Sequence, residues 1–201
     1  QAKTLFPYTT LFRSFQMFEK DLPGQNHTGL SFQKPSDQLP LETCETMNNS
    51  WGYNITDHAY KSTRQIIHYL VKAAALNTNL LLNVGPMPNG KIQPENLDTL
   101  KQVGTWMAKY APTIQGTFGN ILPAQDWGVI TARENIHYIH LLNPQQKPFI
   151  FIPLAGKKLK KAVLFSKGKP VNFKQVPEGI FLYTEEMEMD PIDTVIELNW
   201  Q

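Results

Sequence analysis

Two carboxylic acids, Glu42 and Glu45, lie three residues apart in a short segment, residues 41–47, that follows Pro40. A carboxylic acid with a raised pKa can donate a proton to a departing oxygen and later take one back, which is general acid–base catalysis. Because side chains alternate between the two faces of a strand, we expect Glu42 and Glu45 to point to opposite faces, with only one facing a site. The alternative is that both acids form surface ion pairs.

Aromatic and amide side chains accompany these acids. Trp51 and Tyr53 lie in the loop after the first segment, where exposed rings can stack on the face of a ligand. Asn83 is a polar residue at the end of an apolar run, directly before a Gly-Pro loop, and a buried amide needs hydrogen-bond partners. Trp51 could equally fill a core, and Asn83 could either hold a neighbouring group or cap its loop.

Cysteine and histidine provide no comparable pattern. The single cysteine, Cys44, excludes an intrachain disulfide and a zinc site of the cysteine-pair type, and we interpret it as a small buried hydrophobe rather than a nucleophile. His58, His68, His137 and His140 lack metal-ligand spacing with acidic neighbours. We expect His137 and His140 to be partly exposed strand residues.

Charge and hydropathy argue against two classes of partner. The net charge is only +2 over 201 residues, without a dense basic stripe, which disfavours nucleic acid. No apolar run reaches the roughly 18–20 residues that span a bilayer. The sequence also lacks a phosphate-binding glycine motif.

The periodicity of residues 41–110 indicates the elements that position the candidate residues. Apolar residues recur at helical spacing over 57–76 and again from Pro94 to Tyr110, and the run 80–84 is typical of a strand buried on both faces. The order strand–helix–strand–helix predicts parallel strands. Since two strands cannot bury both helices, we predict the C-terminal part of a (β/α)8-like barrel, in which sites lie at the carboxyl ends of the strands.

Beyond Gly116 the pattern changes to short β-type runs separated by turn residues. These runs are residues 136–142, 149–152, 162–165, 179–183 and 194–198. Regular short strands with turn signals predict an antiparallel β-sandwich over residues 116–201. The expected fold class is therefore α/β plus all-β, with residues 15–115 as the barrel part.

The first residues call for a separate interpretation. Residues 4–14 read TLFPYTTLFRS and look like one reading frame of a widely used sequencing-adapter oligonucleotide. We therefore interpret residues 1–14 as an artefact and expect the native sequence to begin near Phe15, inside a longer protein. The alternative is a natural strand rich in Phe and Thr.

Three segments together resemble one enzyme family. LETCETMNNSWGYN at 41–54 is similar to the active-site segment of the α-L-fucosidases of glycoside hydrolase family 29. NLLLNVGPMPNGKIQP at 79–94 resembles the family's last barrel strand with its loop, and YAPTIQGTFG at 110–119 its crossing into a C-terminal β-sandwich. The resemblance implies hydrolysis of terminal α-L-fucose from glycans with retention of configuration, without a metal or organic cofactor. It also implies a location outside the cytoplasm, periplasmic or secreted.

The resemblance assigns roles residue by residue. Glu42 matches the family's glutamate that precedes a Cys or Asp and would be the acid/base, with Glu45, Glu19 or Asp21 as alternatives. Trp51 would form part of the wall of the fucose pocket, with Tyr53 beside it, and Asn83 would support the site. The family's nucleophilic Asp lies on an earlier strand, so we expect this chain to be a fragment without it and inactive by itself.

Two other functions remain open from the residues. One is a carbohydrate-binding or structural β-sandwich module without catalysis. The aromatic residues of the β region could serve such a module, but they alternate like core residues, so we expect them to pack; they are Tyr138, Phe149, Phe151, Phe165, Phe181 and Tyr183. The other is a homologue that is catalytically inactive even at full length.

Overall fold

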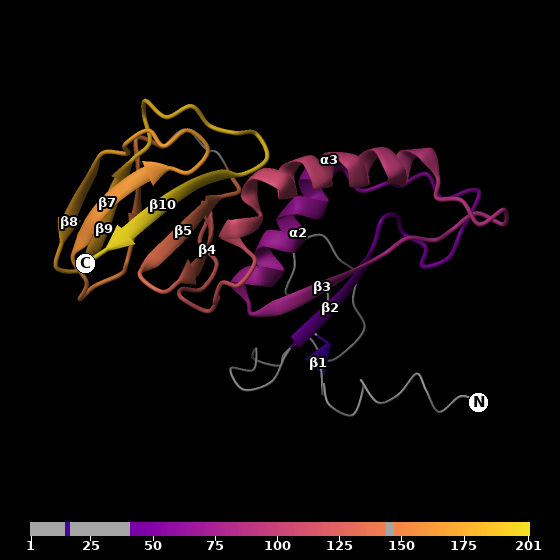
Figure 1. Cartoon of the computed structure of the whole chain (residues 1–201), viewed down its shortest axis with the longest axis horizontal. Coiled ribbons are helices and arrows are strands. Elements are labelled where there is room, and N and C mark those ends of the chain that lie inside the picture. The colour runs from indigo at the N-terminus through magenta and orange to yellow at the C-terminus, as the bar shows by residue number, and fades with distance from the viewer. Residues whose placement is uncertain (1–14, 17–40, 144–146) are drawn as a thin grey trace. The chain divides into compact units, whose positions relative to one another are not determined.

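The computed structural model of the chain describes residues 15–16, 41–143 and 147–201, which fall into two compact units, Gln1–Met107 and Ala108–Gln201 (Figure 1). The division lies near the end of a long helix, N-terminal to the predicted boundary after residue 115. Residues 1–14, interpreted above as an artefact, and the alternative acids Glu19 and Asp21 lie outside the described residues.

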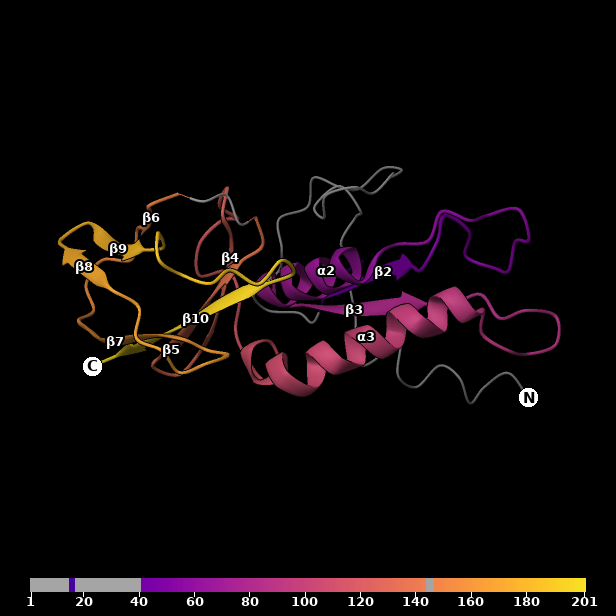
Figure 2. The same cartoon turned by 90° about the horizontal axis from the view of Figure 1, so that it is seen from above.

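The first unit is built on a small parallel sheet with strand order β1-β2-β3. β2 pairs with β3 in parallel from Leu41↔Thr78 to Thr46↔Asn83, and each strand is followed by a helix, as the pattern predicts. Figure 2 shows the two helices running alongside β2 and β3. The elements are β1 (Phe15–Gln16), β2 (Leu41–Thr46), α2 (Thr63–Ala75), β3 (Thr78–Asn83) and α3 (Pro94–Tyr110).

Helix α2 begins later than the periodicity predicts. Ser62 and Gln65 form a capping box: the Ser62 hydroxyl accepts from the Gln65 N–H at 3.3 Å, and Gln65 Oε1 accepts from the Ser62 N–H at 2.8 Å. Residues 57–62 belong instead to a loop, where an Asp57 carboxylate oxygen accepts from the Ala59 N–H. The expected helix start at residue 57 is therefore wrong by about one and a half turns.

The two faces of the sheet differ. Leu80 and Leu82 of β3 pack with both helices around a buried cluster of Met47, Ile66 and Tyr69. On the opposite face Leu81 is 52% exposed, so β3 is not buried on both faces by the described residues. The strand pairing places Glu42, Cys44 and Thr46 on the face of Leu81, and Glu45 on the helix-covered face.

The second unit consists of two antiparallel sheets, so most of the described strands are antiparallel and the helices are few. One sheet has the order β4-β5-β10-β7 and the other β6-β9-β8. β4 and β8 are strands that the sequence runs missed. The elements are η2 (Ala111–Thr113), β4 (Gly128–Arg133), β5 (Ile136–Leu141), β6 (Phe149–Ile152), β7 (Leu159–Leu164), β8 (Phe173–Val176), β9 (Gly179–Tyr183) and β10 (Thr194–Trp200).

A hydrophobic core lies between these sheets. Ile139 and Ile196 contribute to it from the four-stranded sheet, and Ile152, Ile180 and Leu182 from the three-stranded sheet, each fully buried. The alternate residues of β6 and β9 point outward. The two sheets therefore stabilise one another through apolar burial from both inner faces.

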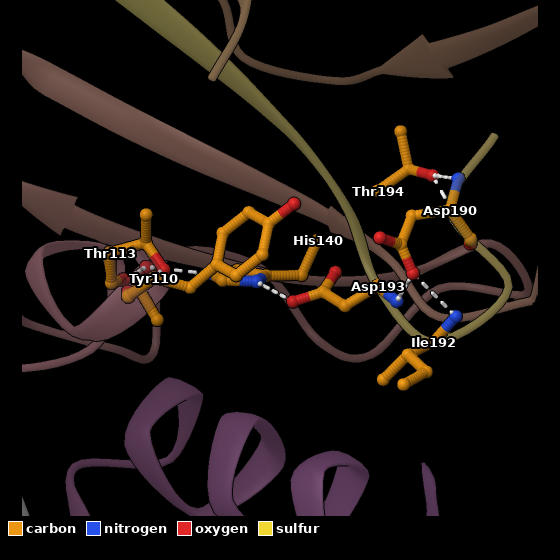
Figure 3. A network of polar contacts seen from close by, with 8 residues as sticks. Tyr110, Thr113, His140, Asp190, Ile192, Asp193 and Thr194 are labelled. Atoms are coloured by element: carbon orange, nitrogen blue, oxygen red, sulfur yellow. Dashed lines mark hydrogen bonds and ion pairs between the residues drawn. The ribbon is translucent and has the colours of Figure 1, made fainter. Parts of the chain in front are cut away.

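A buried series of side-chain hydrogen bonds crosses the second unit (Figure 3). His140 Nδ1 lies 2.8 Å from Asp193 Oδ2, and both side chains are completely buried. On its other side the His140 ring contacts the Thr131 hydroxyl at 3.3 Å, which in turn donates to the Thr113 carbonyl. These hydrogen bonds thus link η2 to β4, β5 and the start of β10. The expected partial exposure of His140 is wrong, because Asp193 and Thr131 provide the polar partners that a buried ring needs.

His137 is also buried, at 8% exposure, which corrects the same expectation for this residue. Its ring packs edge-on against Trp200 with the ring centroids 5.2 Å apart. Burial disfavours the charged ring, and Lys157 adds repulsion, so the pKa of His137 falls from 6.5 to about 4.

The low pKa of His137 predicts that acid destabilises the second unit. Between pH 6.5 and about 4 the unfolded chain binds more protons at His137 than the folded chain, so the free energy of unfolding falls as the pH is lowered through this window. We expect a loss of roughly 1–2 kcal/mol, measured by urea denaturation at a series of pH values. His137→Gln should flatten the curve over this window; an unchanged slope in that variant would contradict the assignment.

Candidate functional site

Two loops meet at the carboxyl edge of the parallel sheet. The first, residues 47–62, follows β2, and the second, residues 84–93, follows β3. Because β2 and β3 are parallel, both loops leave from the same edge, where α/β sheets bind their ligands. The candidate residues Trp51 and Tyr53 lie in the first loop, and Asn83 ends β3.

Asn83 fastens the first loop to the sheet. Its side-chain amide donates to the Trp51 carbonyl at 2.6 Å and to the Thr46 hydroxyl at 3.2 Å. The Thr46 hydroxyl donates in turn to the Ser50 carbonyl at 3.2 Å. Trp51 is thereby held beside the ends of both strands, while 52% of it stays exposed and Tyr53 is half-buried. Of the two roles left open for Asn83, the contacts are those of a loop anchor.

Gly85 brings the backbones of the two loops into contact. A Cβ atom at position 85 would lie 2.6 Å from the Gly52 carbonyl carbon and 2.7 Å from the Tyr53 nitrogen, closer than real Cβ atoms approach. The loops that carry the two family-like segments therefore pack directly on one another, and glycine at position 85 permits it.

Gly85→Ala should separate these loops. We expect the overpacking to lower the free energy of unfolding of the first unit by about 1–3 kcal/mol, measured by urea denaturation and by protease cleavage within residues 47–62. Gly52→Ala is the matched control, because a Cβ atom there meets open space. Equal effects of the two substitutions would contradict this account of the contact.

The two candidate acids have different surroundings. Glu45 is buried and its Oε1 lies 3.0 Å from Lys61 Nζ, and it also accepts from the Thr46 N–H at 2.8 Å. Glu42 is half-buried on the uncovered face of the sheet. The alternation thus separates the acids as expected, and the ion pair with Lys61 gives Glu45 a structural partner.

Lys61 is a residue of this site that the sequence reasoning missed. Its ammonium group also donates to the Asn48 carbonyl at 2.9 Å, and its backbone N–H donates to the Met47 carbonyl at 2.8 Å. Lys61 therefore closes the base of the first loop just before α2 begins. No local motif marks such a lysine, because its partners lie up to sixteen residues away in the chain.

Two further polar side chains shape the loops. Asp57 accepts from the Asn49 N–H at 3.0 Å, and a hydrogen bond from the Ser50 hydroxyl is the main cause that lowers the pKa of this carboxyl. Tyr60 accepts from the Gln93 amide at 2.8 Å, which joins the two loops a second time. Desolvation, with repulsion from Glu95, raises the pKa of Tyr60, so its hydroxyl stays protonated. The sequence analysis did not anticipate these contacts, because residues 57–62 were expected to begin a helix.

Neither a metal centre nor a membrane helix is found in the described part of the chain. Among residues 15–16, 41–143 and 147–201, no three His, Cys, Asp or Glu side chains gather as metal ligands would. Within the same ranges no helix has the length and hydropathy to cross a bilayer.

Together these features define a class: an α/β unit with polar and aromatic loops at the carboxyl edge of its parallel strands, followed in the chain by an all-β unit. The family model described as Alpha-L-fucosidase matches residues 6–112, more than half of the chain. The chain belongs to the α-L-fucosidase family. The match begins inside residues 1–14, whose interpretation as an artefact stays a prediction.

Curated relatives and solved structures agree with this membership. An α-L-fucosidase of Dictyostelium discoideum is 31% identical over 59% of this chain and 25% of its own length. The human plasma α-L-fucosidase is 26% identical over 69% of this chain and 32% of its own length. The structure of α-L-fucosidase isoenzyme 1 from Paenibacillus thiaminolyticus has a TM-score of 0.74 at 34% identity, covering 81% of this chain and 40% of that one. The chain thus spans about a quarter to a third of the curated relatives' length.

Proposed function

We propose that this chain is the C-terminal part of an α-L-fucosidase that removes terminal α-L-fucose from glycans. The observation that carries the proposal is the contact between its two family-like segments at the carboxyl edge of parallel strands, through Asn83 and Gly85. In the whole protein, residues up to about 115 complete a (β/α)8-like barrel, and residues 116–201 form a β-sandwich. The uncovered sheet face that carries Leu81 then becomes part of the barrel interior.

The reaction proceeds with retention of configuration and uses two carboxyl groups. In such enzymes the groups lie about 5–5.5 Å apart; one forms a glycosyl-enzyme and the other acts first as acid and then as base. Glu42 is the acid/base in this proposal, because it lies on the uncovered face, whereas Glu45 is paired with Lys61 on the helix side. Glu42 lies near the amino end of β2 and pairs with Asn79, so it reaches the site from the interior face and not from the loops at the carboxyl edge. The nucleophilic Asp belongs to a strand upstream of this chain.

The aromatic loop residues bind the sugar. The exposed Trp51 ring offers an apolar face to the C–H groups of fucose, and Tyr53 lines the pocket beside it. Asn83 holds the Trp51 backbone in place and so positions the ring. No step requires a metal or an organic cofactor.

The experiment is to recover the coding sequence upstream of Phe15, produce the whole protein, and follow hydrolysis of 4-nitrophenyl α-L-fucopyranoside. NMR of the first product formed should detect α-L-fucose, the retained anomer. The 201-residue chain alone should give no turnover, because it lacks the nucleophile. Turnover by the short chain, or β-L-fucose as the first product of the whole protein, would contradict the proposal.

We further propose that the whole protein acts outside the cytoplasm. Its support is the name of the human relative, a plasma α-L-fucosidase. Fractionation of the source cells, with fucosidase activity assayed in the medium or periplasm and in the cytoplasm, tests the location.

A further inference from the structure

The outer face of the β6-β9-β8 sheet carries an array of aromatic side chains. Phe149 pairs with Tyr183 across β6 and β9, and Phe151 pairs with Phe181 in the next outward row. The residues between them point into the core. These four rings were expected to pack inside, and that expectation is wrong for Phe149 and Tyr183, which are 45% and 42% exposed.

Three of the rings, those of Phe149, Phe151 and Phe181, lie in contact. The Phe181 centroid lies 5.5 Å from that of Phe149 and 4.8 Å from that of Phe151. Phe151 is held over Gly179, where an added Cβ atom would meet the Phe151 ring at 2.9 Å. Adjacent rings thus support one another.

Polar groups border this aromatic face. Lys174 of β8 pairs with Phe181 and continues its row. The Asn172 carbonyl accepts from the Tyr183 N–H at 3.0 Å, so Asn172 lies next to Tyr183. A groove of about 440 Å³ opens there, and its lining includes Asn172, Tyr183, Glu185 and Glu186. The groove therefore adjoins the aromatic face at Tyr183 and places Asn172 and two carboxylate residues beside that ring.

We propose that this face is a non-catalytic binding site for a neutral oligosaccharide chain. Pyranose rings present C–H groups that contact the electron-rich faces of aromatic rings, and they present hydroxyls that donate to carboxylates and accept from amides and ammonium groups. The outward rows of Phe149–Tyr183 and Phe151–Phe181 supply the first kind of contact. Asn172, Glu185 and Glu186 in the groove supply the second. The groove's volume falls within the range of about 300–1,000 Å³ typical of small-molecule sites.

The same chemistry disfavours other occupants. Glu185 and Glu186 repel anionic partners such as nucleic acid. A stable protein interface needs about 20–30 residues on each side with an apolar centre, whereas this surface offers four rings bordered by charged side chains. The site belongs to the second unit and does not depend on the catalytic proposal for the first.

The test is an NMR titration of the ¹⁵N-labelled 201-residue chain with di-N-acetyllactosamine, a neutral β-linked tetrasaccharide. We expect saturable shifts of the amides of β6, β9 and residues 170–174. Tyr183→Ala should weaken binding about tenfold, because it removes an exposed stacking ring, while Tyr183→Phe should stay within about twofold. Phe118→Ala is the control: it removes an exposed ring beside β4, on the other sheet of the second unit, and should not change the titration.

Three outcomes would overturn the proposal. One is the absence of saturable shifts, and another is equal affinity of the Tyr183→Ala variant and the unchanged chain. The third is concentration-dependent dimerisation that Tyr183→Ala abolishes, since the face would then bind a second copy. Thermal unfolding of each variant verifies that the second unit remains folded. Loss of fucosidase activity in the whole protein would leave this result unaffected, so the two proposals fail separately.

Discussion

Glu42→Ala in the whole enzyme is expected to lower kcat/KM by about 10²–10⁴-fold for a fucoside with a poor leaving group. The departing alkoxide then receives no proton, and the glycosyl-enzyme receives no help from a base. With a 2,4-dinitrophenyl leaving group, which departs without a proton, the first step should survive and the second should limit the rate. Steady-state rates with the two substrates measure this difference.

Azide provides the distinguishing observation for Glu42. It needs no general base, so it should restore turnover of the Glu42→Ala variant and give α-L-fucosyl azide, with the configuration retained. Glu45→Gln is the matched control: it breaks a buried ion pair with Lys61, so it should lower the stability of the first unit and show no azide rescue. Rescue of Glu45→Gln, or full activity of Glu42→Ala, would reverse the assignment of the two acids.

Asp193→Ala should cost the second unit about 3 kcal/mol of its free energy of unfolding. The substitution removes the hydrogen-bond partner of His140 Nδ1 at a position where both side chains are completely buried, so a polar imidazole nitrogen loses its partner away from water. It also breaks the series of side-chain hydrogen bonds that joins η2 to the start of β10 (Figure 3). Urea denaturation followed by tryptophan fluorescence measures the loss.

Asp126→Ala is the matched control for Asp193. Asp126 also pairs with a basic side chain of the second unit, Lys147, but it is 65% exposed at the side chain. An exposed pair contributes about 0–1 kcal/mol, so this variant should remain close to the unchanged chain. Similar losses for the two aspartates would show that the buried hydrogen bonds of His140 contribute no more to the free energy of unfolding than an exposed ion pair does.

The overall division into an α/β part and a β part could be predicted because hydrophobic period and strand length differ between them. The runs at 41–47 and 80–84 indicated β2 and β3, and their parallel order followed from the helix between them. β8 was missed, since the exposed polar residues Lys174 and Gln175 leave only two partly buried positions. The start of α2 was missed because the capping box at Ser62, a local hydrogen-bond pattern, overrode the longer apolar period.

Contacts between distant residues explain most of the remaining differences. The strands FIFI and GIFLY carry apolar residues on both faces. The alternation of side chains therefore did not indicate that Phe149 and Tyr183 face outward. His140 is buried because Asp193 lies 53 residues further along the chain. The meeting of the two candidate loops could be anticipated from parallel strands, but the ion pair of Glu45 with Lys61 could not.

Because Gly52 and Gly85 lie in contact, the sequences of the two loops cannot change independently of one another. A longer or bulkier second loop has no room unless the first loop moves with it, since their backbones already touch. Chimeras that exchange only one loop with another fucosidase should therefore fold poorly, while exchange of residues 47–62 together with 84–93 should be tolerated. A change of substrate preference would then require both loops to change together.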